Sequence, residues 1–281
     1  MIYLLGVQGQ LCNQLFRLAH HVANSLQYDY RLSCPVFPYH AYFPNLDAQP
    51  LISFKKSKAD WQEKITKVVS KGISNDRIQK IMKILGVRVM DSPYYFTDTD
   101  IDFIRVAKQR PTLVTTWLFR DYINFKSKAD LIRHLFEPAS KYRCEADKVL
   151  LSVKTNGKVV VGIHIRRGDY KEWEGGRYHY DDAIYYKLIQ HLLTLPGLSN
   201  AVFCLCSNEP VNKENYHGLP IVDSVNNHFM TDLTLLSYCD YLVGPPSTFS
   251  AWASFMGQTP LYHVLSATDQ PKLSDFSVVA G

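Results

Sequence analysis

The chain has little of what marks a membrane-spanning, secreted or repetitive protein. No apolar run approaches the ~20 residues that a helix needs to cross a bilayer. Residues 1–7 lack the basic start and the long apolar core of a signal peptide, so we expect them to form a first strand. Internal repeats and low-complexity tracts are also absent from the sequence. These absences predict a cytoplasmic globular protein.

Charge of one sign is also scarce. The 31 basic and 26 acidic side chains leave a formal net charge of +5. This is too small an excess to indicate nucleic-acid binding, but it suits a protein with a small anionic substrate.

The six cysteines are scattered and do not form the framework of a small disulfide-rich domain. Cys204 and Cys206 lie on one face of an expected strand, but no nearby cysteine or histidine completes a tetrahedral set of metal ligands. We therefore expect reduced thiols in the core and no metal site.

The pattern of strands and helices predicts an α/β protein. With 46% hydrophobic residues, 281 residues can build one large domain or two of ordinary size. Residues 1–34 indicate a strand, a turn, a helix and a second strand, and after residue 156 strands alternate with helices. Parallel βαβ units with right-handed crossovers follow from that alternation. The Asn156-Gly157 turn divides the chain into expected domains at 1–155 and 156–281.

Residues 55–85 are basic and have a helical pattern. One interpretation is a solvated pair of helices packed on the N-terminal half, interrupted at Gly72 and Asn75. The alternative is a peripheral contact with an anionic membrane surface.

Residues 159–169 carry the strongest functional signal. An uninterrupted β-branched run predicts a strand buried on both faces, and His164, Arg166, Arg167 and Asp169 stand at its end. Ligands of open α/β sheets bind just beyond the carboxyl ends of the strands. Two guanidiniums there indicate a phosphate or diphosphate, although a surface loop with self-paired charges is the alternative. Alternation leaves one arginine to hold the ligand and the other to hold the loop or bind Asp169.

Two further turns join a strand to a helix. Residues 245–250 place Ser247 and Thr248 at a helix start, where hydroxyls, backbone N–H groups and the helix dipole can receive a phosphate. Residues 9–16 contain Asn13 in a similar place. In both turns a simple helix cap is the competing explanation.

Together these segments resemble the fucosyltransferase superfamily, most closely the α-1,2-fucosyltransferases of glycosyltransferase family 11. The signature His-x-Arg-Arg-x-Asp is unbroken from His164 to Asp169. The other family patterns follow in order as Cys12-Asn13-Gln14-Leu15-Phe16, as Asp232-Leu233-Thr234-Leu235-Leu236-Ser237-Tyr238-Cys239, and as Ser247-Thr248-Phe249-Ser250-Ala251-Trp252. The chain departs from the family at Cys12, at Pro245-Pro246 and at Asn208.

The resemblance implies a GT-B fold, two Rossmann-like domains facing across a cleft, and glycan biosynthesis from GDP-fucose. It implies a metal-independent, inverting transfer, in that family usually to O2 of a galactose, with donor binding by the C-terminal domain and no cofactor. Arg166 would neutralise the β-phosphate and Asn13 would reach the phosphate–fucose linkage. The remaining donor contacts would be His164, Arg167, Asp232, Ser247, Thr248 and Phe249.

Three questions stay open in the sequence. Asp169 is a candidate general base, but adjacent arginines disfavour proton uptake by its carboxylate, which favours a structural role. Asp98 and Asp100 match the Asp-x-Asp metal motif of GT-A transferases, although they also stand where a helix over residues 101–108 would be capped. A protein that binds nucleotide or glycan without turnover would retain the same motifs.

Overall fold

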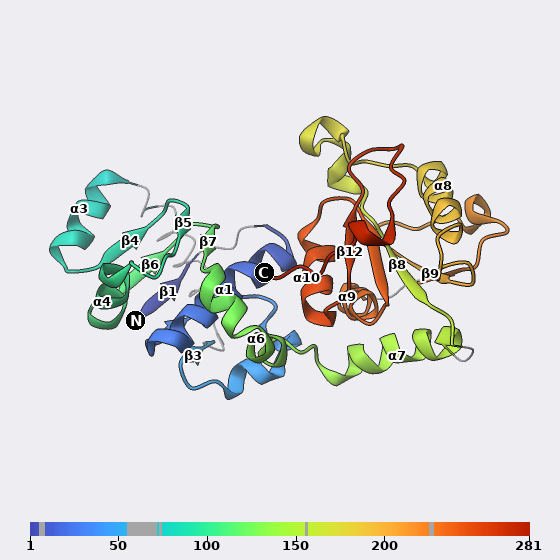
Figure 1. Ribbon diagram of the computed structural model, residues 1–281. Helices are drawn as coiled ribbons and strands as arrows, with labels where there is room; N and C mark the ends of the chain where they lie inside the picture. Colours follow the sequence, from blue (N-terminus) through green and yellow to red (C-terminus); the bar gives the residue numbers. More distant parts are fainter. Residues whose placement is uncertain (6–8, 55–71, 73–74, 155–156, 225–227) are drawn as a thin grey trace. The chain divides into compact units, whose positions relative to one another are not determined.

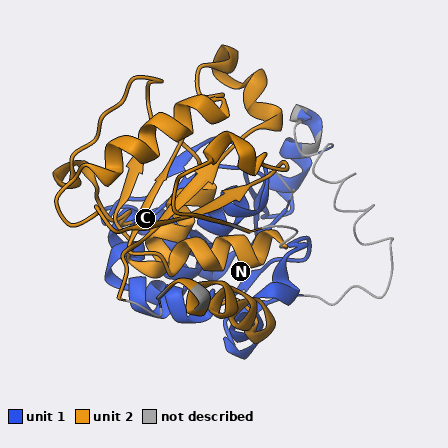
Figure 2. Cartoon of the chain, turned by 90° about the vertical axis from the view of Figure 1, so that its right-hand side faces the viewer, with its two compact units in different colours: residues 1–137, 281 blue, residues 138–280 orange. Residues whose placement is uncertain are grey.

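The chain divides into two compact units (Figure 2). The computed structural model describes residues 1–5, 9–54, 72, 75–154, 157–224 and 228–281. The first unit holds residues 1–137 and 281, and the second holds residues 138–280. The division comes earlier than the expected boundary after residue 155, because helix α7 (Ser140–Lys154) packs on helix α9 (Phe229–Ser237) of the second unit. Across that contact the Thr231 hydroxyl donates to Glu145 at 2.6 Å.

The first unit is built on a five-stranded parallel sheet. Helix α1 (Leu11–Tyr28) follows the first strand, which confirms the predicted strand–turn–helix–strand opening. The strand order is β3 (Ile52–Ser53), β2 (Leu32–Ser33), β1 (Ile2–Leu4), β6 (Thr112–Val114) and β4 (Arg88–Met90).

Helix α1 joins the ends of two of these strands through a buried arginine. Arg17 donates to the carbonyl oxygens of Leu5 at 3.0 Å and Val114 at 2.9 Å. Burial lowers the pKa of its guanidinium to about 10, so the side chain remains charged at neutral pH. The second turn of α1 is thereby fixed against the carboxyl edge of the sheet.

Smaller elements complete the first unit. Strands β5 (Tyr94–Tyr95) and β7 (Phe119–Arg120) pair in parallel, and residues 35–50 contain 3₁₀-helices at His40–Tyr42 and Pro44–Ala48. Two short helices of this unit meet at Lys128. The helices are α3 (Asp76–Ile84), α4 (Ile101–Gln109), α5 (Tyr122–Ser127) and α6 (Ala129–Leu135).

Most of the basic segment 55–85 lies outside the described residues. Its described part, α3 and the residue after it, exposes Ile81, Ile84 and Leu85. Contact of this segment with a membrane surface stays a prediction. No helix within the described part of the chain is both long and apolar enough to span a bilayer.

The second unit contains another five-stranded parallel sheet, which confirms the predicted βαβ alternation (Figure 1). Strand β8 is central and all six of its residues are buried. The strand order is β10 (Ile221–Asp223), β9 (Val202–Ser207), β8 (Val160–Ile165), β11 (Tyr241–Gly244) and β12 (Leu261–His263). The remaining helices are α8 (Asp182–Leu193) and α10 (Thr248–Gly257).

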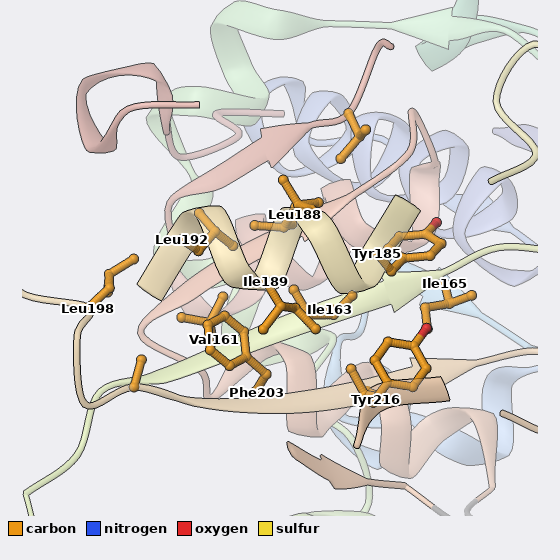
Figure 3. Packing of buried hydrophobic residues seen from close by; sticks show 14 of the residues in the cluster. Val161, Ile163, Ile165, Tyr185, Leu188, Ile189, Leu192, Leu198, Phe203 and Tyr216 are labelled. Carbon is orange, nitrogen blue, oxygen red and sulfur yellow. The ribbon is translucent and has the colours of Figure 1, made fainter. Parts of the chain in front are cut away.

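Burial against α8 holds the central strand in place (Figure 3). Leu188, Ile189 and Leu192 from the buried face of the helix belong to one core cluster with Val161 and Ile163 of β8. Fully burying a side chain of this size stabilises the fold by roughly 1.5–3 kcal/mol. The end of β8 is therefore fixed by the core, and the residues that follow it start from a rigid support.

Candidate active site

His164 is the last-but-one residue of β8 and is buried. Its ring packs on Phe249 of α10, with centroids 5.1 Å apart and an interplanar angle of 33°. Burial lowers its pKa to about 3, and the charges of Arg166 and His263 act in the same direction. Its imidazole is therefore neutral at physiological pH, with one ring nitrogen free of a proton and able to accept a hydrogen bond.

The low pKa of His164 predicts an acid-dependent loss of stability. Below pH 6.5 the unfolded histidine binds a proton that the buried, neutral side chain does not. The stability that His164 contributes is therefore fully present above pH 6.5 and is lost as the pH falls towards 3. We expect His164→Asn to reduce the slope of the unfolding free energy against pH, between pH 3 and 6.5, by up to about 1.4 kcal/mol per pH unit. Urea titrations at several pH values measure the slope. The same change at exposed His217 should leave the slope as in the wild type, and equal slopes for His164→Asn and wild type would contradict the account.

The end of β11 lies against the end of β8. A Cβ atom at Gly244 would stand 2.8 Å from the carbonyl oxygen of His164 and 2.9 Å from its Cβ, so only glycine permits this approach. The chain then turns through Pro245 and Pro246 into α10. The two segments recognised separately in the sequence are thus in direct contact.

Ser247 caps α10: its hydroxyl accepts a hydrogen bond from the backbone N–H of Phe249 at 3.2 Å. The capping interpretation is therefore confirmed for Ser247. It is compatible with anion binding, because the first turn of a helix carries several N–H groups without intrahelical acceptors and the positive end of the dipole. Thr248 is the first residue of the helix and is half-buried.

Arg166 follows β8 directly and forms an ion pair with Asp169, with 2.7 Å between Nη2 and Oδ1. The arginine side chain is 14% exposed and the aspartate 55% exposed. The guanidinium also lies over the ring of Tyr170, with 5.5 Å from Cζ to the centroid. Arg166 is thus a largely buried cation at the carboxyl end of the central strand, oriented by a carboxylate and an aromatic ring.

Arg167 has a different role in the structure. Its guanidinium forms an ion pair with Asp182 in the first turn of α8. Asp182 also accepts hydrogen bonds from Asn215 at 2.7 Å and from the Tyr216 hydroxyl at 2.8 Å. The backbone N–H of Arg167 donates to Asn208 at 2.7 Å, so the residue that departs from the family pattern holds this loop. Of the two arginines, Arg167 anchors the loop, and Arg166 is the one that binds Asp169.

Asp232 lies in α9 and is buried close to the same strand end. Burial, and after it the negative charge of Asp232, raise the pKa of Cys206 well above its usual range. Cys206 is the residue of β9 paired with His164 in the sheet register. The structure therefore brings Asp232 and His164 to one end of the sheet, as the sequence motifs suggested.

Tyr170 was missed by the sequence reasoning, although it directly follows the signature. Its hydroxyl donates to the carbonyl oxygen of Pro246 at 2.5 Å. Burial raises the pKa of Tyr170, and a hydrogen bond with the Ser247 side chain opposes that rise. Together with the contact to Arg166, these bonds connect the loop after β8 to the start of α10. The available signal was a polar aromatic residue directly after the aspartate that ends the signature.

Asn13 belongs to the first unit, in the first turn of α1. It is not the cap of that helix, since Gln10 occupies the cap position. Its side chain lies against Gly9: a Cβ atom at Gly9 would stand 2.6 Å from Nδ2 of Asn13, and Gly9 has a φ of +74°. Cys12, which replaces the family's glycine, is a buried helical residue.

The Asp-x-Asp motif has a local structural role. Asp100 occupies the cap position of α4, but its carboxylate accepts from the backbone N–H of Thr97 at 2.8 Å instead of from a helical N–H. Within the described residues no group of three or more His, Cys, Asp or Glu side chains has the arrangement of a metal site. The six cysteines are free thiols, and Cys144 alone is exposed.

Comparisons with known proteins agree with the motifs. The model of glycosyl transferase family 11 matches residues 115–274, more than half of the chain. Galactoside alpha-(1,2)-fucosyltransferase 2 of Hylobates lar is 25% identical over 180 residues, covering 57% of this chain and 49% of that protein. The protein of the same name from Gorilla gorilla gorilla is 28% identical over 153 residues, covering 48% and 43%. The chain spans about half the length of these curated relatives.

Solved structures share the fold at low sequence identity. A mutant of Arabidopsis thaliana FUT1 in complex with GDP gives a TM-score of 0.61 at 12% identity, covering 98% of this chain and 72% of that one. POFUT1 with GDP-fucose gives 0.56 at 10% identity, covering 94% and 97%. NodZ alpha-1,6-fucosyltransferase soaked with GDP-fucose gives 0.54 at 15% identity, covering 93% and 94%.

These structures are of the GT-B type, so the predicted fold class, an α/β protein with two Rossmann-like domains, is confirmed. The sequence motifs and the family model point to the same set of proteins. The chain therefore belongs to glycosyl transferase family 11.

Proposed function

We propose that this protein transfers fucose from GDP-fucose to a hydroxyl of a glycan, O2 of a galactose, forming an α-1,2 linkage. The observation that carries the proposal is the placement of Arg166 at the end of the central strand, connected through Tyr170 to Pro246, just before α10. An arginine and a helix N-terminus side by side are suited to a diphosphate. Relatives named as galactoside alpha-(1,2)-fucosyltransferases support the sugar and the linkage.

We assign the donor contacts of the second unit from the match of its motifs to the family, and the geometry above supports the assignment. Arg166 binds the β-phosphate, and Ser247, Thr248 and Phe249 line the phosphate and nucleoside pocket. His164 and Asp232 bind the guanosine, His164 through its neutral ring and Asp232 through its carboxylate. Arg167 holds the loop in place through its ion pair with Asp182. It therefore contributes to donor binding indirectly, by positioning Arg166.

The chemistry requires an anion to leave the fucose. Opposite unit charges 4 Å apart interact by about 4 kcal/mol at an effective dielectric of about 20. Enzymes lower barriers by roughly 8–23 kcal/mol, so one arginine and helical N–H groups supply a useful part. By its match to the family pattern, we assign Asn13 to the phosphate–fucose linkage. The displacement then inverts the anomeric centre through an oxocarbenium-like transition state and needs no metal.

The acceptor proton leaves late, to the departing diphosphate or to solvent. Asp169 is engaged with Arg166, so its carboxylate serves first to orient the guanidinium. The Asp169 side chain is 55% exposed, so an acceptor sugar can reach its carboxylate. It is the one carboxylate of the signature that could receive the proton of the sugar hydroxyl.

The experiment is an incubation with GDP-fucose and a panel of galactosides, with the product linkage determined by NMR. We expect α-linked fucose on O2 of galactose, release of GDP, no transfer from GDP-mannose, and an unchanged rate in EDTA. Complete loss of activity in EDTA, restored by manganese, would favour the metal-dependent alternative that uses Asp98 and Asp100. Binding of GDP without transfer to any acceptor would contradict an enzymatic function.

A further inference from the structure

The loop after the arginine signature exposes a tryptophan. Trp173 is 41% exposed, whereas Trp252 in the same unit is 1% exposed. It lies in a 3₁₀-turn, Trp173–Gly176, three residues after Tyr170. The donor contacts assigned above do not include it, and the core cluster of the unit does not contain it.

The indole packs against two aromatic neighbours and stays partly exposed. Its centroid is 4.7 Å from the Tyr170 ring and 5.4 Å from the Tyr178 ring, with interplanar angles of 39° and 33°. Tyr170 in turn lies under the Arg166 guanidinium, and the Arg177 guanidinium lies 5.0 Å from the centroid of Tyr178. Successive contacts therefore connect Arg166 to Tyr170, Tyr170 to Trp173, and Trp173 to Tyr178. Trp173 stands one ring beyond Tyr170.

The backbone of this loop turns through three consecutive residues in the left-handed region. Glu174, Gly175 and Gly176 have φ values of +51°, +67° and +78°. The left-handed region is disfavoured for a residue with a Cβ atom, so Glu174 persists there only because its surroundings require it. A Cβ atom at Gly176 would stand 2.9 Å from the carbonyl oxygen of Lys171. The exposed indole is thus presented by a tight, closely packed turn.

We propose that Trp173 is the surface on which the acceptor's galactose ring stacks, a specificity-determining contact that rests on the function proposed above. One face of galactose carries contiguous C–H bonds because its O4 is axial, and such a face packs well on an aromatic ring. A tryptophan provides a large contact area at a small conformational cost. Trp173 is connected to Arg166 through the single ring of Tyr170, so a sugar stacked on the indole lies close to the proposed diphosphate site.

The test compares Trp173→Ala with Trp173→Phe, and uses Leu265→Ala as the matched control, since Leu265 is a large apolar residue of the same unit that is 52% exposed. Calorimetry measures the Kd of lactose for the GDP-loaded protein, and kinetics give the KM of lactose, the KM of GDP-fucose and the rate of donor hydrolysis. We expect Trp173→Ala to raise the Kd and KM of lactose at least tenfold while both donor constants stay within twofold. Trp173→Phe should recover most of the affinity, and Leu265→Ala should resemble the wild type.

The two proposals fail in different ways. Wild-type protein that transfers fucose while Trp173→Ala keeps its affinity for lactose overturns the stacking contact alone. A loss of affinity for GDP-fucose as large as the loss for lactose also overturns it, because Trp173 would then serve the donor. Lactose binding that depends on Trp173 in a protein without transfer supports the contact and contradicts the enzymatic function.

Discussion

Arg166→Lys is expected to lower kcat for fucosyl transfer by about 100- to 1000-fold, the usual effect of removing one preorganised donor to a developing charge. The guanidinium presents a planar fork that can hold Asp169 and a phosphate oxygen at once, whereas an ammonium is a point charge on a flexible stem. The β-phosphate gains charge as the bond to fucose breaks. The loss should therefore fall on kcat more than on the KM of GDP-fucose.

Arg105→Lys is the matched control for this substitution. Arg105 also pairs with an aspartate three residues away, Asp102, at 2.6 Å, but this pair is exposed and lies in the first unit. Its replacement should leave kcat within about twofold, since an exposed ion pair contributes 0–1 kcal/mol. Transfer by Arg166→Lys at the rate of the control would remove Arg166 from the mechanism.

Asp182→Ala is expected to destabilise the second unit by about 3 kcal/mol. Asp182 is 13% exposed, and its carboxylate receives the Arg167 guanidinium together with two hydrogen bonds. Without it a guanidinium that is 16% exposed lacks its counter-ion, and the Tyr216 hydroxyl, on a buried tyrosine, loses its acceptor. Urea unfolding followed by circular dichroism measures the loss.

Asp130→Ala provides the comparison, because Asp130 pairs with Arg133 at 2.7 Å but is 96% exposed. Its loss should cost less than about 1 kcal/mol. The double variant Arg167→Met with Asp182→Leu should recover part of the stability, since it removes both buried charges. Equal effects of Asp182→Ala and Asp130→Ala would show that the Asp182 anchor does not hold the loop.

The sequence was sufficient to predict the strands and helices that have a clear hydrophobic pattern. The all-buried run of β8 was predicted because an uninterrupted apolar strand fits only the interior of a parallel sheet. The contact between the signature loop and residues 245–250 followed from strand ends that share one edge of a sheet. His164 and Asp232 were placed there by motif alone.

The sequence was insufficient where a partner distant along the chain decides the structure. Nothing local shows that Arg167 pairs with Asp182 while Arg166 pairs with Asp169. The assignment of α7 to the second unit depends on its packing against α9, almost eighty residues later. The position of Trp173 likewise depends on its contacts with Tyr170 and Tyr178, which no periodicity reveals.

The crystal structure of the protein soaked with GDP tests the central claim most directly. The account predicts that the diphosphate binds beside Arg166, with its oxygens facing the first turn of α10 at Thr248, and that the base lies near His164 and Asp232. A diphosphate bound away from Arg166 and α10 would contradict the account.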